Sequence, residues 1–169
     1  MSEKKNPVEK VGGLDEDDST GEIELTSKGG DKKKLPKKHA MISGLVKTAL
    51  EQDSGATEVP LPGVTSEILH KVVEYMKHHE GKEPPIIPKP LRSKKMKEVC
   101  EDHWDATFID SVGENRQKLY DLILAANYMD IKSLLHLGCA KVASLIKGEP
   151  LEKIKGIIEP CDKQKDGSA

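Results

Sequence analysis

The stretch that decides the fold is residues 119–148, LYDLILAANYMDIKSLLHLGCAKVASLIKG, the most apolar part of a chain in which 33% of the residues are charged. Its first part, Leu119 to Met129, has few polar side chains to turn toward water: Asp121, Asn127 and the hydroxyl of Tyr128. It belongs to a helix predicted at about 116–128. A helix that is apolar nearly all round must be covered on every side. We therefore expect this helix to be enclosed by other elements of its own domain.

The part after Asp130 predicts a helix with a one-sided apolar stripe, which Gly148 and Pro150 end. LEKIKGIIEP at 151–160 then predicts a last short amphipathic piece. The stripe carries Ile131, Leu134, Leu135, Val142, Leu145 and Ile146, then Leu151 and Ile154.

Upstream, EIELTSKGGDKKKL at 22–35 alternates apolar and polar residues around a KGGD turn, which predicts two strands. HAMISGLVKTALEQ at 39–52 has the period of a short helix packed on one side. TEVPLPGV at 57–64 predicts a brief extended piece, and TSEILHKVVEYMKHHEG at 65–81 an amphipathic helix closed by its glycine. The predicted fold class is α+β, a small three-stranded sheet packed with helices.

Residues 82–103, KEPPIIPKPLRSKKMKEVCEDH, predict a long irregular loop because they contain four prolines and a basic cluster. The only Trp and the only Phe follow, at Trp104 and Phe108. We expect these two rings to pin the loop onto the core, the alternative being an exposed docking anchor.

Charge and composition exclude several classes of function. The formal net charge of -2 argues against a nucleic-acid binder, and the sequence has no apolar run long enough to span a membrane. Residues 1–20 contain no apolar h-region, so no secretory signal is expected. The three cysteines, Cys100, Cys139 and Cys161, are odd in number and widely spaced. Reduced thiols are expected from that pattern, which predicts a cytoplasmic and nuclear protein.

Candidate catalytic and metal-ligating residues are sparse. His78 and His79 are adjacent, so on a helix they point about 100° apart, and Cys100 with His103 supplies two ligands where structural zinc needs four. No nucleophile motif or phosphate-binding glycine loop is present. We therefore expect no catalytic activity, no cofactor and no metal ion.

Three strings resemble a known family: VPLPGVTSEILHKVVEYMKHH at 59–79, WDATFID at 104–110, and the opening stretch. They are similar to the Skp adaptor subunit of SCF ubiquitin ligases, and LILAANYMDIKSLL at 122–135 is the most specific match. The resemblance runs from about residue 22 to 155. It implies a BTB/POZ fold with a C-terminal helical extension, although KKHAMISGLVKTAL at 37–50 looks more like elongin C, the sister family.

The resemblance implies an adaptor with two protein partners. In the family the BTB part binds a cullin, and the AANY segment that faces it maps to Asn127 and Tyr128. The last helices interlock with the F-box of a substrate receptor, which implies that the stripe is shared with a partner. The alternative is that the final short helix folds back and covers it. The implied F-box-binding residues are Ile131, Leu134, Leu135, Val142, Leu145, Ile146, Leu151 and Ile154.

The predicted organisation is a disordered tail at 1–21, a BTB/POZ domain at 22–130, a partner-binding extension at 131–159 and a second tail at 160–169. The family continues beyond this point into an acidic segment with a terminal Trp that clamps the F-box, so weaker F-box binding or another helical partner is expected here. Weak homodimerisation is open, because BTB relatives often self-associate. Two other functions also stay open: a structural subunit of a large assembly without ubiquitin chemistry, and an elongin-C-like adaptor.

Overall fold

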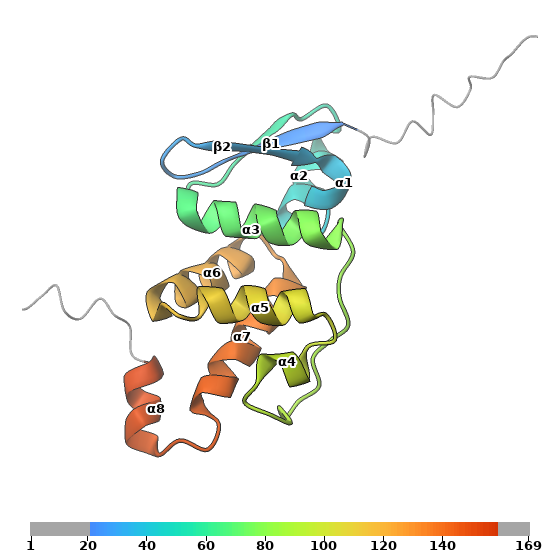
Figure 1. The fold of residues 1–169 in the computed structure, drawn as a ribbon. Helices are drawn as coiled ribbons and strands as arrows, with labels where there is room; N and C mark the ends of the chain where they lie inside the picture. Colours follow the sequence, from blue (N-terminus) through green and yellow to red (C-terminus); the bar gives the residue numbers. More distant parts are fainter. Residues whose placement is uncertain (1–20, 159–169) are drawn as a thin grey trace, which may run out of the picture.

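The computed structural model describes residues 21–158 (Figure 1). The tails predicted at 1–21 and 160–169 therefore lie, apart from Gly21, outside the described residues. The elements in chain order are β1 (Glu22–Thr26), β2 (Lys32–Pro36), α1 (Lys37–Ala40), α2 (Gly44–Gln52), β3 (Glu58–Pro60), α3 (Ser66–His79), α4 (Met96–Val99), α5 (His103–Val112), α6 (Arg116–Tyr128), α7 (Lys132–Ile146) and α8 (Leu151–Ile158).

The sheet has three strands, as the sequence predicted, and their order is β2-β1-β3. β1 pairs antiparallel with β2 through a turn at Gly30, whose φ of 92° suits glycine, and parallel with β3. Ile23, Leu25 and Leu35 are buried, while their neighbours in the strands are exposed or partly exposed. The period-two pattern thus gives one apolar face, which α3 covers (Figure 1).

Helix α3 packs its apolar stripe into the core from Ile68 to Met76. It ends at His79, after which Glu80 and Gly81 both have positive φ. A Cβ at Gly81 would collide with the backbone carbonyl of Lys38, so glycine is needed here on two grounds.

The single helix predicted at 39–52 is instead two helices, α1 and α2. Ser43 separates them, since its extended backbone lies at the N-cap of α2 and its hydroxyl accepts the N–H of Val46. Apolar periodicity alone did not reveal this break.

The loop predicted at 82–103 is less irregular than expected, because it contains α4 with Met96 and Val99 buried. The loop leads into α5, where the Trp104 and Phe108 rings stack with centroids 5.0 Å apart. Phe108 is buried and Trp104 is partly buried against the core. The two rings therefore pin the loop to the core, as the first of the two alternatives predicted.

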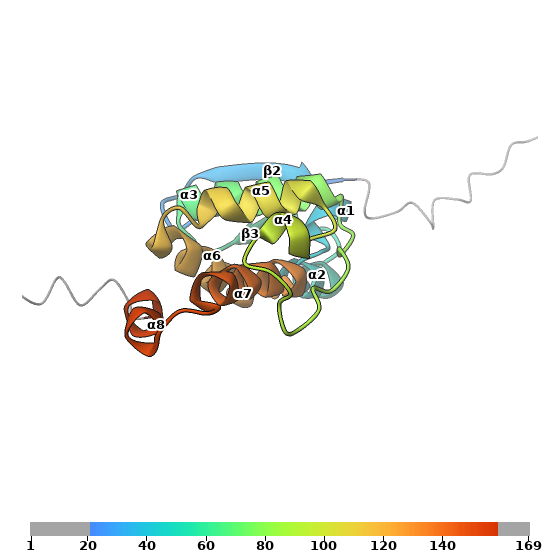
Figure 2. The ribbon, with the colours of Figure 1, turned by 60° about the horizontal axis from the view of Figure 1, so that its bottom comes forward.

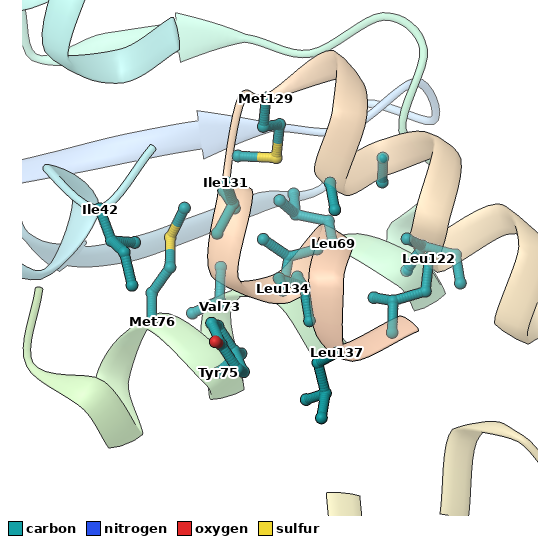
Figure 3. Close-up of a cluster of buried hydrophobic side chains, with 14 of the residues drawn as sticks. Ile42, Leu69, Val73, Tyr75, Met76, Leu122, Met129, Ile131, Leu134 and Leu137 are labelled. Atoms are coloured by element: carbon teal, nitrogen blue, oxygen red, sulfur yellow. The ribbon is translucent and has the colours of Figure 1, made fainter. Parts of the chain in front are cut away.

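Helices α6 and α7 complete one continuous core with α3. Figure 3 shows Ile131 and Leu134, from the start of the predicted extension, beside Leu69 and Val73 of α3. The hydroxyl of the buried Tyr75 donates to Ser133 Oγ at 3.0 Å. The core thus runs through the predicted boundary at residues 130–131, and that boundary stays a prediction.

Helix α8 projects from one end of the molecule in both orientations (Figures 1 and 2). Among residues 21–158, none of the helices is long and apolar enough to serve as a membrane span.

Candidate partner-binding surface

Helix α6 presents an open face, contrary to the expectation that its own domain encloses it. Leu119, Leu122, Ala125 and Ala126 are buried, but Leu124 is 65% exposed. The sequence pattern counted apolar residues all round the helix and did not reveal which side the fold leaves uncovered.

The exposed face of α6 contains both residues implied to bind a cullin. Asn127 and Tyr128 are exposed, and Leu124 precedes them by three and four residues, which puts all three on one side of the helix. The Tyr128 ring lies about 4.0 Å from where a Cβ on Gly63 would stand, in the segment between β3 and α3. The sequence analysis did not identify Leu124 as a surface residue. Its position three and four residues before Asn127 and Tyr128 could have indicated that it shares their side of the helix.

The turn between α6 and α7 is fastened to the start of α2. Ser43 Oγ donates to the carbonyl of Met129, and the backbone N–H of Gly44 donates to the carbonyl of Asp130 at 2.9 Å. Met129 itself is fully buried. These bonds fix the end of α6, and therefore the direction in which Asn127 and Tyr128 point.

The predicted F-box stripe divides into a buried part and a more accessible part. Ile131 and Leu134 have 0% exposure and belong to the core, so we correct their assignment as partner-binding residues. Their apolar spacing fits a core face and an interface equally well, and α3 is what covers them. The partly buried members are Leu135, Val142, Leu145 and Ile146.

An apolar groove of about 750 Å³ runs between α7 and the loop before α4. Ile86, Pro88 and Leu91 line one side of it, and Ala143 and Ile146 of α7 line the other. Ile86 is largely exposed. The groove thus connects Ile146, at the end of the stripe, with the apolar residues of the loop.

Helix α8 has no buried residue, and Leu151 and Ile158 expose more than half of their surface. Ile154, the last implied F-box contact, is only partly covered. At its far end the carbonyl of Gly156 accepts from Arg116, and the carbonyl of Ile157 accepts from the Tyr120 hydroxyl. Contacts with α6 thus hold α8 by its end, and much of its apolar surface stays open.

Charged contacts also hold the connection between α7 and α8. Lys94, in the loop before α4, donates to Glu149 at 3.0 Å, and Lys153 of α8 lies 3.4 Å from the same carboxylate. The hydrogen bond from Lys94, with the positive charge of Lys153, holds the pKa of Glu149 below its usual range. Gly148 precedes this carboxylate with a φ of 76°, which lets the chain turn into α8.

The cysteines in the described part of the chain are unpaired, with Cys100 buried and Cys139 exposed. Burial, with the charge of Asp105 nearby, raises the pKa of the Cys100 thiol to about 11. The thiolate is the reactive form, so Cys100 is a poor nucleophile near neutral pH. The one group of side chains in residues 21–158 with metal-ligating atoms close together lies elsewhere, at the end of α3 and the start of α5.

Comparison with known proteins agrees with this architecture. Residues 22–81 match the model of the Skp1 family tetramerisation domain. The S-phase kinase-associated protein 1 homolog of Tetrahymena thermophila is 46% identical over 116 residues, which cover 69% of this chain and 68% of that protein.

Two further relatives span more of the chain. The E3 ubiquitin ligase complex SCF subunit sconC of Arthroderma otae is 39% identical over 139 residues, which are 81% of each protein. The SKP1-like protein 13 of Arabidopsis thaliana is 35% identical over 136 residues, 80% of this chain and 82% of that one. These identities extend well beyond the sheet and α3 into the helices that carry the candidate surface, and on them the chain belongs to the Skp1 family.

Proposed function

We propose that this chain is the adaptor subunit of an SCF-type ubiquitin ligase, in which it joins a cullin to an F-box protein. The observation that carries the proposal is its membership of the Skp1 family, whose fungal relatives in Arthroderma are named as SCF subunits of an E3 ubiquitin ligase complex. An adaptor needs two separate surfaces, and apolar side chains are exposed on both α6 and α8. The chain itself, in this proposal, carries no catalytic activity and acts by holding its partners.

The cullin surface in this proposal consists of Leu124, Asn127 and Tyr128 on α6. An exposed tyrosine is typical of a binding hot spot, in which a few large side chains supply most of the affinity. Leu124 adds exposed apolar surface beside it. The hydrogen bonds from the start of α2 to the turn after α6 hold this face in one orientation before the partner binds.

The F-box surface consists of the accessible part of the stripe together with α8. Of the set that the family resemblance implied, we leave out Ile131 and Leu134 because they are fully buried. Leu151 is kept and Ile158 is added, because these are the most exposed apolar residues of α8. The full proposed set is Leu135, Val142, Leu145, Ile146, Leu151, Ile154 and Ile158.

Two double variants test the proposal, and each should lose binding to a different partner. Asn127→Lys with Tyr128→Glu places charges on α6, and Leu151→Asp with Ile158→Asp places charges on α8. Purified wild-type and variant chains are each mixed with a cullin N-terminal domain and with an F-box peptide, and both dissociation constants are measured. The α6 variant should lose cullin binding by about 100-fold or more and keep the F-box, while the α8 variant should do the reverse.

Glu22→Lys is the matched control, since it changes a charge at the exposed start of β1, away from both surfaces. It should leave both affinities unchanged, and circular dichroism should show all three variants folded. The proposal fails if the wild-type chain binds neither partner, or if each variant weakens both partners equally.

The two alternative functions predict different results. A structural subunit would bind an F-box-like helix but no cullin, and an elongin-C-like adaptor would capture elongin B. The relatives' names favour neither, and α7 and α8 continue the chain beyond the point where elongin C ends. The predicted weaker F-box binding would appear as a higher dissociation constant than that of the Tetrahymena relative for the same peptide.

We also propose that the protein works in the cytoplasm and nucleus, which the unpaired Cys100 and Cys139 support. Microscopy of the tagged full chain tests this, and staining confined to the secretory pathway would contradict it. Weak homodimerisation stays a prediction, for which sedimentation velocity over a range of concentrations is the measurement.

A further inference from the structure

Four side chains with metal-ligating atoms converge where α3 ends and α5 begins. His78 and His79 are the last residues of α3, Asp102 is the N-cap of α5, and Asp105 lies in its first turn. One nitrogen or oxygen atom from each of the four lies within 4.8 Å of the others. The sequence pointed to His78 and His79 but not to the two aspartates, because the whole loop at 82–101 separates the two pairs.

Each imidazole already faces a carboxylate. His78 Nε2 is 2.7 Å from Asp102 Oδ2, and His79 Nε2 is 2.6 Å from Asp105 Oδ1. The two rings lie edge to face with centroids 4.9 Å apart, although the residues are adjacent on the helix. Both reactive nitrogens are therefore directed at the same small region.

The surrounding residues fix the orientation of these groups. The His78 ring stacks on Trp104 at 3.9 Å with the planes 10° apart, and the His79 ring packs against Tyr75 at 4.4 Å. Asp102 uses Oδ1 to accept the backbone N–H of Trp104 at 2.8 Å, which leaves Oδ2 turned toward His78. Such supporting contacts are what hold first-coordination ligands in metal proteins.

The cluster is closed on one side and open on the other. The side chains of His79 and Asp105 are 8% and 6% exposed, whereas those of His78 and Asp102 are 31% and 39% exposed. An ion can therefore enter from the side of His78 and meet a partly water-excluded pair beyond it.

We propose that His78, His79, Asp102 and Asp105 form a binding site for a divalent transition-metal ion, with Zn²⁺ as the best match. Two imidazoles and two carboxylates are a ligand set that Zn²⁺ accepts in four-coordinate geometry. The two carboxylates balance the charge of the ion, and the ion takes the place of the hydrogen-bonded protons between the paired groups. A neutral ring with its proton on Nε2 shifts that proton to Nδ1, and a protonated ring releases one proton to solvent.

The site would join the two ends of the loop at 82–101. Its ligands come from both sides of that segment, so a bound ion would restrain the loop that lines the groove along α7. This consequence is separate from the proposed adaptor function, which needs no metal.

The test uses the full chain, stripped with a chelator and titrated with ZnCl₂ in a calorimeter. One Zn²⁺ per chain should bind, with affinity falling as the pH drops, because protons compete with the ion for its ligands. His78→Gln and Asp102→Asn should each weaken binding by at least about tenfold. Both residues are partly exposed, so these variants keep the fold, which circular dichroism checks.

His103→Gln is the matched control because it removes an exposed imidazole directly beside Asp102. Its affinity should stay within about twofold of wild type, since it supplies no ligand. X-ray absorption at the zinc edge should give nitrogen and oxygen neighbours only. The absence of saturable binding, equal losses in His103→Gln and His78→Gln, or a sulfur neighbour from a cysteine would each overturn the site.

Discussion

Helices α7 and α8 follow one another in the chain and both carry an apolar stripe, yet only α7 buries residues in the core. Leu134 of α7 is 0% exposed, whereas Leu151 of α8 is 67% exposed. The difference lies in what faces each helix, since α7 packs on α5 and α6, while α8 is held mainly by contacts near its ends. An amphipathic pattern thus predicts that one face of a helix will be buried. Only the tertiary structure shows whether the same chain or a partner protein buries it.

The largest expected change in the free energy of unfolding comes from a substitution in the buried part of the α7 stripe. Leu134→Ala should lower the free energy of unfolding by about 2–5 kcal/mol, because it leaves a cavity among fully buried neighbours. Urea denaturation followed by circular dichroism measures it. A loss below about 1 kcal/mol would mean that α7 is not part of the core and would remove the contrast with α8.

The second prediction uses one glycine from each helix. A Cβ at Gly138 would stand 2.5 Å from Ile123 Cγ1 of α6, whereas a Cβ at Gly156 of α8 meets nothing within 4 Å. Gly138→Ala should therefore cost about 1–3 kcal/mol through overpacking. Gly156→Ala should be neutral or stabilise by up to about 1 kcal/mol through helix propensity.

Urea denaturation of both glycine variants makes this comparison. Adding Ile123→Ala to Gly138→Ala should recover part of the loss relative to the sum of the single variants, since it removes the atoms that the new methyl meets. Equal effects at Gly138 and Gly156 would contradict the close approach of α6 and α7.

The third prediction concerns the exposed stripe. Leu151→Ala should change the free energy of unfolding by less than about 0.5 kcal/mol, because the side chain is already mostly in water. Binding of an F-box peptide should nevertheless weaken, as measured by fluorescence anisotropy. A large loss of stability would show that α8 is part of the folded core, contrary to its lack of buried residues.

The smallest effect is expected at the connection between the two helices. Lys94 holds the pKa of Glu149 below the ordinary value of 4.5, so the folded chain binds this proton less readily than the unfolded chain. The contribution of the contact is present above pH 4.5 and is lost as the pH falls through the lowered pKa. Amide chemical shifts of α8 should move in that range, and Glu149→Gln should abolish the movement without changing the shifts of α7.

The elements of this fold follow from local patterns, whereas the surfaces do not. Alternation at Ile23 and Leu25 predicts a half-buried strand, and the α3 stripe predicts its own burial, because both depend on neighbours in the chain. The open side of α6 at Leu124 depends on where α3 and α7 lie. The pairing of His79 with Asp105 joins residues 26 apart in sequence, so spacing rules for metal ligands do not detect it. Ser43 was missed as a helix boundary because the apolar period continues across it.

The core extends from Ile23 to Ala140, which has a consequence for biosynthesis. A nascent chain that has released only the residues up to α3 holds Leu69 and Val73 without Leu134, which covers them in the finished protein. Apolar surface of this kind makes incomplete chains prone to aggregate until their domain is whole. Translation past α7 is therefore the event that protects the newly made protein, and products that stop earlier should depend on chaperones or be degraded.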